Sequence, residues 1–263
     1  MRDHGRMRPE PVTRLSPRGL RHVVLTQQWR ELAFLHWPVP SADVAPLLPP
    51  GTRPDEPDGT PGTTYVGLVP FRMTRVGVLR SPGVPWFGTF PETNVRLYSV
   101  DGAGRRGVVF RSLEAARLVP VLVARATLRL PYRWARMRID HVGDEVRYET
   151  RRHRLEGHPH GSTVRIRVGP PLPEADPLER FLTARWGLHT RVGDRTLYLP
   201  NTHPEWPLYR ADLLVCDDDL VAAAGLPGVT GPPTSVLYSP GVPVRFGPPT
   251  VVAEATRTGP AGG

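Results

Sequence analysis

The sequence predicts a single α+β domain built on a large antiparallel sheet or β-barrel. Short apolar stretches of alternating character recur along the chain, and turn-forming residues separate them. The 33 prolines and 26 glycines favour many short strands joined by turns over long helices. A chain of 263 residues, 39% of them hydrophobic, can bury a substantial core in one domain. We find neither an internal boundary nor a repeat.

The N-terminal half predicts strands and turns with two short helices. Strands are expected, in chain order, over residues 23–39, 63–78, 89–98 and 108–115. The segment SADVAPLLPPG predicts a short helix with Ser41 as its N-cap. Asp101 and Gly102 mark a hairpin turn. The apolar segment RLVPVLVARATL, residues 117–128, predicts a short buried helix.

The C-terminal half predicts a meander, a helix and further strands. A three-stranded meander is expected from Ala135 to Gly169, with a turn at residues 141–144. The segment DPLERFLTARWG predicts a helix, because Asp176 and Glu179 form a capping box and Gly187 can end it. The remaining expected elements are strands over 195–200, 207–216 and 234–246 and a small helix over 219–224.

The domain is expected to span residues 21–253. Residues 1–20 are rich in Arg and Pro and lack the apolar region of a secretory signal, so they predict a disordered tail in which Met7 is an alternative start. Residues 254–263 predict a second disordered tail. The apolar runs are too short to cross a bilayer, so we expect a cytoplasmic protein without a membrane partner.

Every one of the 34 basic residues is an arginine, and the sequence contains no lysine. A formal net charge of +9 ordinarily suggests a polyanionic partner. Here the arginines are scattered, and their exclusive use is typical of a GC-rich coding bias. A nucleic-acid partner is therefore the less favoured hypothesis.

The sequence predicts neither a metal site nor a cofactor site. A single cysteine, Cys216, excludes an intramolecular disulfide and any multi-cysteine metal site. His153, His158 and His160 lie in a Gly- and Pro-containing turn without a carboxylate or cysteine at ligand spacing, which favours a solvated loop. We find no phosphate-binding or dinucleotide-binding glycine pattern.

Three polar residues alternate along the predicted strand TFPETNVRLY. Glu92, Asn94 and Arg96 share one face, whereas Val95 and Leu97 lie on the other. This polar row is either the solvated side of a sheet or the wall of a ligand cavity. Burying it requires partners from neighbouring strands or from a ligand, because unpaired polar groups are costly to desolvate. We favour the cavity.

Further candidate residues have both a functional and a structural interpretation. Arg125 is able to bind a carboxylate or simply to pair with a glutamate of the sheet, and the Tyr132 hydroxyl is able to donate to a carbonyl. His36 is a candidate base, although core histidines are more common. The remaining candidates are Arg72 and the alternating pair Ser112 and Glu114, which would share a face with the polar row if their strands pair.

Eight ordered segments resemble one family. FLHWPVP, YVGLVPFRM, FPETNVRLY, GVVFRSLEA, ARATLRLPY, FLTARWGLHT, WPLY and LYSPGVPV are similar to the YqjF-like family, domain of unknown function 2071, over Leu25 to Val244. That family is similar in fold to acetoacetate decarboxylase. The resemblance therefore implies a curved sheet or barrel around a small ligand cavity. It places Glu92 at the acid of the decarboxylase and Tyr132 at its lysine.

Because the sequence has no lysine, the resemblance implies the fold of acetoacetate decarboxylase but not its reaction. Schiff-base catalysis needs a primary amine that can lose its proton, and a guanidinium cannot replace it. The sequence offers no lysine amine, so imine-forming decarboxylation is excluded.

Two hypotheses share the expected cavity. In the first, a cofactor-independent lyase or isomerase without imine chemistry binds a small organic acid or keto compound. Arg125 or Arg96 holds the anionic group, Glu92 accepts a proton and Tyr132 orients a carbonyl. In the second, the same cavity belongs to a non-catalytic binding or sensor module. The sequence is also compatible with a homo-oligomer.

Overall fold

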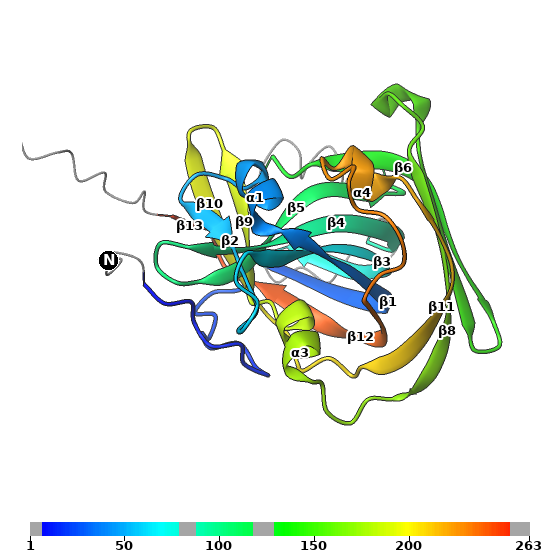
Figure 1. The fold of residues 1–263 in the computed structure, drawn as a ribbon, viewed down its shortest axis with the longest axis horizontal. Coiled ribbons are helices and arrows are strands. Elements are labelled where there is room, and N and C mark those ends of the chain that lie inside the picture. The colour runs from blue at the N-terminus through cyan, green and yellow to red at the C-terminus, as the bar shows by residue number, and fades with distance from the viewer. Residues whose placement is uncertain (1–6, 79–87, 118–128, 253–263) are drawn as a thin grey trace, which may run out of the picture.

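The computed structural model describes residues 7–78, 88–117 and 129–252 (Figure 1). Thirteen strands make up most of it: β1 (Leu25–Pro40), β2 (Thr52–Pro54), β3 (Thr63–Val78), β4 (Phe90–Asp101), β5 (Arg106–Ala115), β6 (Tyr132–Val142), β7 (Glu145–Arg152), β8 (Gly161–Pro171), β9 (Gly187–Val192), β10 (Arg195–Thr202), β11 (Tyr209–Asp218), β12 (Ser235–Phe246) and β13 (Thr250–Val251). The helices in these ranges are short: α1 (Ser41–Val44), η1 (Ala45–Leu47), η2 (Arg154–Glu156), α3 (Pro177–Thr183) and α4 (Leu220–Ala223).

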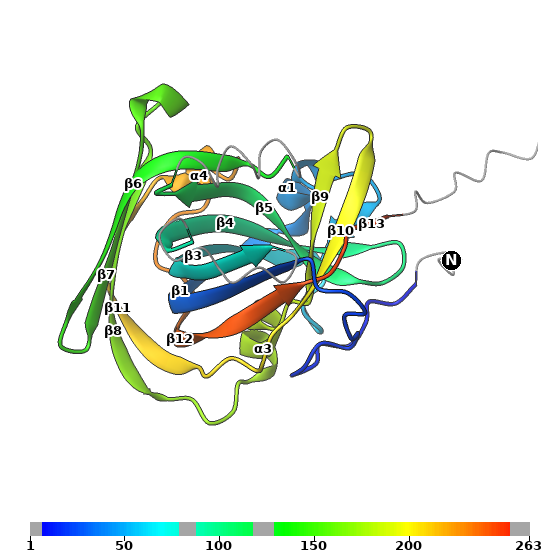
Figure 2. The same ribbon diagram turned by 180° about the vertical axis from the view of Figure 1, so that it is seen from behind.

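All thirteen strands belong to one sheet that closes twice. Strands β5, β6, β7, β8, β11, β12, β1, β3 and β4 pair in that order, and β4 returns to β5, which closes a nine-stranded barrel. A second closure runs from β5 through β9 and β10 to β12. Figures 1 and 2 show β6, β7, β8 and β11 curving around one side and β9 and β10 standing on the other. Strands β12, β1, β3, β4 and β5 are therefore a wall common to both rings.

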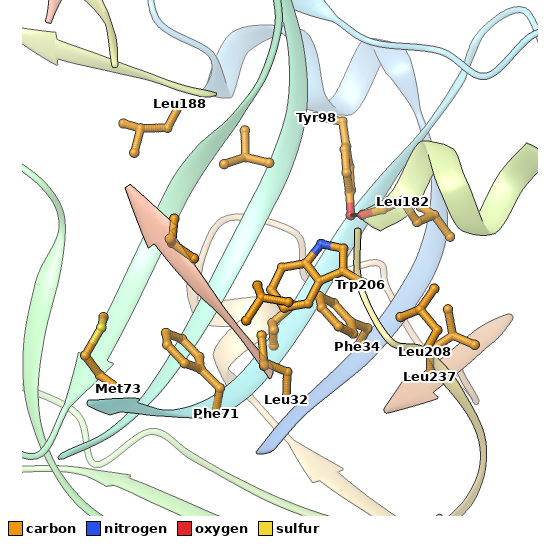
Figure 3. Close-up of a cluster of buried hydrophobic side chains, with 14 of the residues drawn as sticks. Leu32, Phe34, Phe71, Met73, Tyr98, Leu182, Leu188, Trp206, Leu208 and Leu237 are labelled. Atoms are coloured by element: carbon orange, nitrogen blue, oxygen red, sulfur yellow. Dashed lines mark hydrogen bonds between the residues drawn. The ribbon is translucent and has the colours of Figure 1, made fainter. Parts of the chain in front are cut away.

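The two faces of this common wall carry different cores. One face packs inside the nine-stranded barrel, where Val95 and Leu97 of β4 join Val146 of β7 and Ile166 of β8. The other face packs against α3, β9, β10 and the chain around Trp206. Figure 3 shows this second core, with Trp206 beside Phe34 and the Tyr98 hydroxyl directed at the Leu182 carbonyl. Since both faces are enclosed, alternating residues of β4 enter two separate interiors.

The fold agrees with the α+β barrel that the sequence predicts. The expected strand over residues 63–78 coincides with β3, and the hairpin at Asp101 joins β4 to β5. Most pairings are antiparallel, with parallel exceptions between β5 and β6 and between β5 and β9. Helix α3 has the predicted capping box of Asp176 and Glu179 but ends at Thr183, because the chain then turns into β9. The helix expected over 117–128 lies outside the described residues except for Arg117.

Two local expectations differ from the structure. Ser41 is the first residue of α1 and makes no capping bond, since Pro40 occupies the N-cap position. The segment expected as an N-terminal tail contacts the barrel from Glu10 onward: Glu10 pairs with Arg18, and its side chain accepts a bond from the Arg106 amide. Residues 1–6 and the expected tail over 254–263 lie outside the described residues.

Candidate functional site

The polar row on β4 lines a buried cavity. Glu92, Asn94 and Arg96 are only 3%, 6% and 7% exposed. They face a cavity of about 80 Å³ on the side of the wall that packs against β9, β10 and α3. The other lining residues are Leu25, Gln27, Trp29, Leu32, Val69, Phe71, Met73, Val108, Phe110, Leu113, Leu130, Tyr132, Thr183, Arg185, Leu188, Leu199, Asn201, His203, Trp206 and Phe246. The solvated-face interpretation of the row is therefore wrong.

Glu92 is a neutral acid at physiological pH. Burial raises the pKa of its carboxyl to about 8, and the nearby charge of Glu114 acts in the same direction. The Tyr132 hydroxyl donates to Glu92 Oε2 over 3.0 Å, which opposes the rise in pKa without cancelling it. At pH 7 the carboxyl thus retains a proton that it can donate to a molecule in the cavity.

Arg96 is held at the cavity by the end of α3. Its Nη2 donates to the Leu182 carbonyl over 3.0 Å, and its guanidinium lies over the rings of Phe34 and Tyr98. Its Nε is buried and has no hydrogen-bond partner. Arg96 therefore keeps an unused donor at the cavity.

His36 lies behind the cavity and does not line it. The Tyr98 hydroxyl donates to the Leu182 carbonyl over 2.8 Å, so it accepts from His36 Nε2, 2.8 Å away. Burial holds the pKa of His36 well below its usual value, and the charges of Arg96 and Arg185 lower it further. His36 was expected to contact a ligand, but in the structure its neutral, fully buried imidazole contacts Tyr98 instead.

Arg185 is a second cavity arginine that the sequence did not single out. Its Nη1 pairs with Asp55, and its guanidinium stacks 4.1 Å from the centre of the Phe181 ring. Its Nε and Nη2 are buried without partners. Burial lowers the pKa of Arg185 and Asp55 opposes this, but a guanidinium stays protonated at neutral pH. Arg185 lies just beyond the end of α3. It was overlooked because it falls within the longer helix that the capping residues predicted.

Asn201 and His203 complete the polar lining from the C-terminal side. Asn94 and Asn201 are each 6% exposed, and the side-chain oxygen of each lacks a hydrogen-bond partner. His203 Nδ1 lies 2.6 Å from the Pro204 carbonyl, and burial lowers the pKa of His203 to about 4, so the ring is neutral. Neither residue is among those predicted from the sequence, because the strand expected over residues 195–200 stops one residue before Asn201.

The cavity has more positive than negative charge at neutral pH. Arg96 and Arg185 both line it, whereas Glu92 is neutral. The buried Asp55 carboxylate is shared between Arg185 and Arg106. An anionic group in the cavity would therefore lower the local excess of positive charge.

Ser112 and Glu114 face the opposite interior. The register pairs Glu114 with Thr93 and Ser112 with Val95, so both lie on the nine-stranded barrel side of the wall. There Glu114 pairs with Arg152 and accepts a bond from the Ser112 hydroxyl. The expectation that they share a face with Glu92 is wrong, because pairing alternates by residue and shifts only beyond Val95.

The remaining candidates do not join the cavity in the described structure. Arg72 alternates with Phe71 and Met73 and pairs with Glu31 instead of lining the cavity. Arg125 lies outside the described residues. Within the described ranges no group of three His, Cys, Asp or Glu side chains is arranged to hold a metal ion. No helix among the described residues is long and apolar enough to span a membrane.

The doubly closed sheet is the acetoacetate decarboxylase-like fold. The chain is similar to an acetoacetate decarboxylase-like enzyme from Sphingomonas wittichii RW1, with a TM-score of 0.61, 11% identity and coverage of 91% of this chain and 97% of that one. It is also similar to the enduracididine biosynthesis enzyme MppR complexed with pyruvate, with a TM-score of 0.59, 13% identity and coverage of 89% and 92%.

The chain belongs to the DUF2071 family of uncharacterised conserved proteins, whose model matches residues 26–243. It is 30% identical over 203 residues to the uncharacterised protein YqjF of Bacillus subtilis (strain 168), covering 77% of this chain and 82% of that protein. The family and the fold that the eight sequence segments indicate are thus confirmed.

Proposed function

We propose that the cavity binds a small carboxylate whose charge is held by Arg96 and Arg185. The observation that carries this proposal is that two arginines lining one cavity have unpartnered guanidinium nitrogens, Nε of Arg96 and Nε and Nη2 of Arg185. Leaving buried charged donors unpaired is costly, and a carboxylate accepts from guanidinium groups in a favourable geometry. The similarity to MppR, which binds pyruvate in a solved complex, supports a ligand of this size and charge.

Catalysis in this cavity would be proton transfer without an imine. The sequence has no lysine, so a lyase or isomerase reaction would depend on acid–base groups. The raised pKa of Glu92, about 8, makes it a proton donor to a substrate carbonyl at neutral pH, in place of the acceptor role suggested by its position alone. Tyr132, which donates to Glu92, keeps the acid oriented.

A binding or sensor module is the second candidate function. Among the described cavity residues, Glu92 is the one carboxyl group, and His203 is neutral, with a pKa of about 4 and its Nδ1 beside the Pro204 carbonyl. Reactions that both remove and return a proton often use two such groups. This lining therefore favours reversible binding unless Glu92 performs both steps.

Calorimetry with pyruvate, acetoacetate, propionate and the uncharged ketone acetone tests the proposal. We expect the wild type to bind at least one carboxylate and not acetone, and Arg185→Gln to weaken carboxylate binding at least about tenfold. Arg136→Gln removes the same charge from the exposed face of β6 and serves as the matched control. Absence of carboxylate binding, or equal losses in both variants, would contradict an anion site. Proton NMR of each mixture then separates turnover from binding.

A further inference from the structure

The cavity contains acceptors as well as donors. The side-chain oxygens of Asn94 on β4 and Asn201 on β10 are buried and unpartnered. Both residues line the same cavity as the two arginines. A carboxylate held by the arginines has only hydrogen-bond acceptors, and a keto oxygen is also an acceptor without a donor. Neither group could satisfy an amide oxygen.

A hydroxyl group solves this mismatch because it donates and accepts at once. Glu92 and Asn94 are two residues apart on the same strand face, so their side chains stand next to each other along the cavity wall. A ligand hydroxyl between them can accept the proton of the neutral Glu92 carboxyl and donate its own proton to an amide oxygen. A keto oxygen at the same place can make only the first of these bonds.

Solvent strengthens the preference. A cavity of about 80 Å³ has room for water in the free protein, and a water molecule that reaches an amide oxygen of the lining donates a hydrogen bond to it. A ligand that displaces such water without replacing its donated hydrogen bonds loses affinity. A hydroxylated ligand replaces at least one of them.

Resting on the proposed carboxylate site, we infer that the ligand is a short hydroxy acid, whose carboxylate is held by Arg96 and Arg185 and whose hydroxyl donates to Asn94 or Asn201. The cavity volume restricts the acid to about two to four carbons. The corresponding keto acid is then the weaker ligand of the same site.

Matched ligand pairs test this inference on the wild-type protein. Calorimetry at pH 7 compares lactate with pyruvate and 3-hydroxybutyrate with acetoacetate, with propionate and butyrate as acids that lack the second oxygen function. We expect at least one hydroxy acid to bind about tenfold or more tightly than its keto partner. Keto acids that bind equally or better would overturn the hydroxy-acid inference while leaving the carboxylate site intact. No binding of any of the six acids would instead overturn the site itself.

Variants of the two asparagines locate the effect. Asn94→Leu and Asn201→Leu each replace an amide by an apolar side chain of similar volume, and thermal unfolding checks that each variant is folded. We expect at least one of them to abolish the preference for the hydroxy acid while the affinity for propionate stays within about threefold of wild type. Equal losses for all acids in both variants would assign the asparagines to structure and overturn the inference.

Discussion

The properties of Glu92 follow from where its side chain lies. Alternation along β4 puts it on the cavity face, and burial there raises its pKa to about 8. The folded chain therefore holds a proton that an exposed glutamate, with a pKa near 4.5, releases. The stabilisation from this bound proton is complete below pH 4.5 and is lost as the pH rises to about 8.

Replacing Glu92 by Gln should remove this pH dependence. Gln resembles the protonated carboxyl in shape, so we expect Glu92→Gln to melt near the wild-type temperature at pH 5. Between pH 5 and pH 8 the free energy of unfolding of the wild type should fall relative to the variant by about 1.4 kcal/mol per pH unit. Urea unfolding at four pH values measures the difference.

Glu174→Gln is the control, because it makes the same change at an exposed carboxylate. Its stability should run parallel to that of the wild type over this range. A Glu92→Gln curve parallel to wild type would mean that Glu92 is ionised in the folded protein.

The sequence identified part of the site at the level of single residues. Glu92, Asn94 and Arg96 were found because strand alternation is a local pattern, and all three line the cavity. Arg185 and Asn201 were missed because their positions depend on how α3 and β10 pack against β4. That packing is tertiary, and no spacing along the chain encodes it.

The pairing of β4 with β5 determines which interior each polar residue enters. The register shift between Val95 and Arg96 leaves Arg111 without a partner in β4, and Arg111 bonds to the Ala224 and Leu47 carbonyls instead. Between this shift and the end of β5, Ser112 and Glu114 enter the nine-stranded barrel. Hydrophobic patterning predicted both strands but not this register, which depends on long-range pairing.

The buried pair of Glu114 and Arg152 should contribute stability and not binding. Arg152→Leu leaves Glu114 buried without its cation, which we expect to cost about 3–5 kcal/mol in urea unfolding. Arg151→Leu, at the exposed neighbouring position of β7, should change stability by less than about 0.5 kcal/mol. Loss of ligand binding by a fully stable Arg152→Leu protein would instead assign Glu114 to a ligand site.

The sequence predicted most long strands and two short helices, α1 and α4, but missed the shortest strands. Strand β3 matched its expected bounds because sixteen residues give a clear pattern and turn residues flank them. Strands β2, β9 and β13 were missed. With three, six and two residues, they are too short for a periodic signal and exist through pairing with longer neighbours.

At the scale of the whole molecule, several exposed arginines pair with acids. On the outer face of β6, β7 and β8, Arg138 pairs with Asp140 and Arg167 with Glu145. Such pairing lowers the local excess of positive charge that polyanion binding needs. This arrangement agrees with the lower preference for a nucleic-acid partner, which stays a prediction.

A chain of polar contacts connects the N-terminal segment to the cavity. The Glu10 backbone carbonyl accepts a bond from Arg106 Nε over 2.6 Å, Arg106 pairs with Asp55, and Asp55 pairs with Arg185. Since Arg185 is a proposed ligand contact, the N-terminal segment would help to position it.

Removing residues 1–18 should therefore weaken carboxylate binding about three- to tenfold with the fold retained, as measured by calorimetry and circular dichroism. A protein that starts at Met7 keeps Glu10 and Arg18 and is the matched control, with the affinity of the full chain. Equal affinities in all three proteins would show that Arg185 is positioned without the segment.

Because β4 belongs to the wall shared by the two rings, any one-residue shift in its pairing register should be destabilising. In a sheet with one face in solvent, a one-residue register shift exposes hydrophobic side chains to water. Here the same shift would move Glu92, Asn94 and Arg96 into the nine-stranded barrel and would move Val95 and Leu97 to the face that lines the cavity. Packing inside the barrel and packing around the cavity thus both favour the same register of β4 during folding.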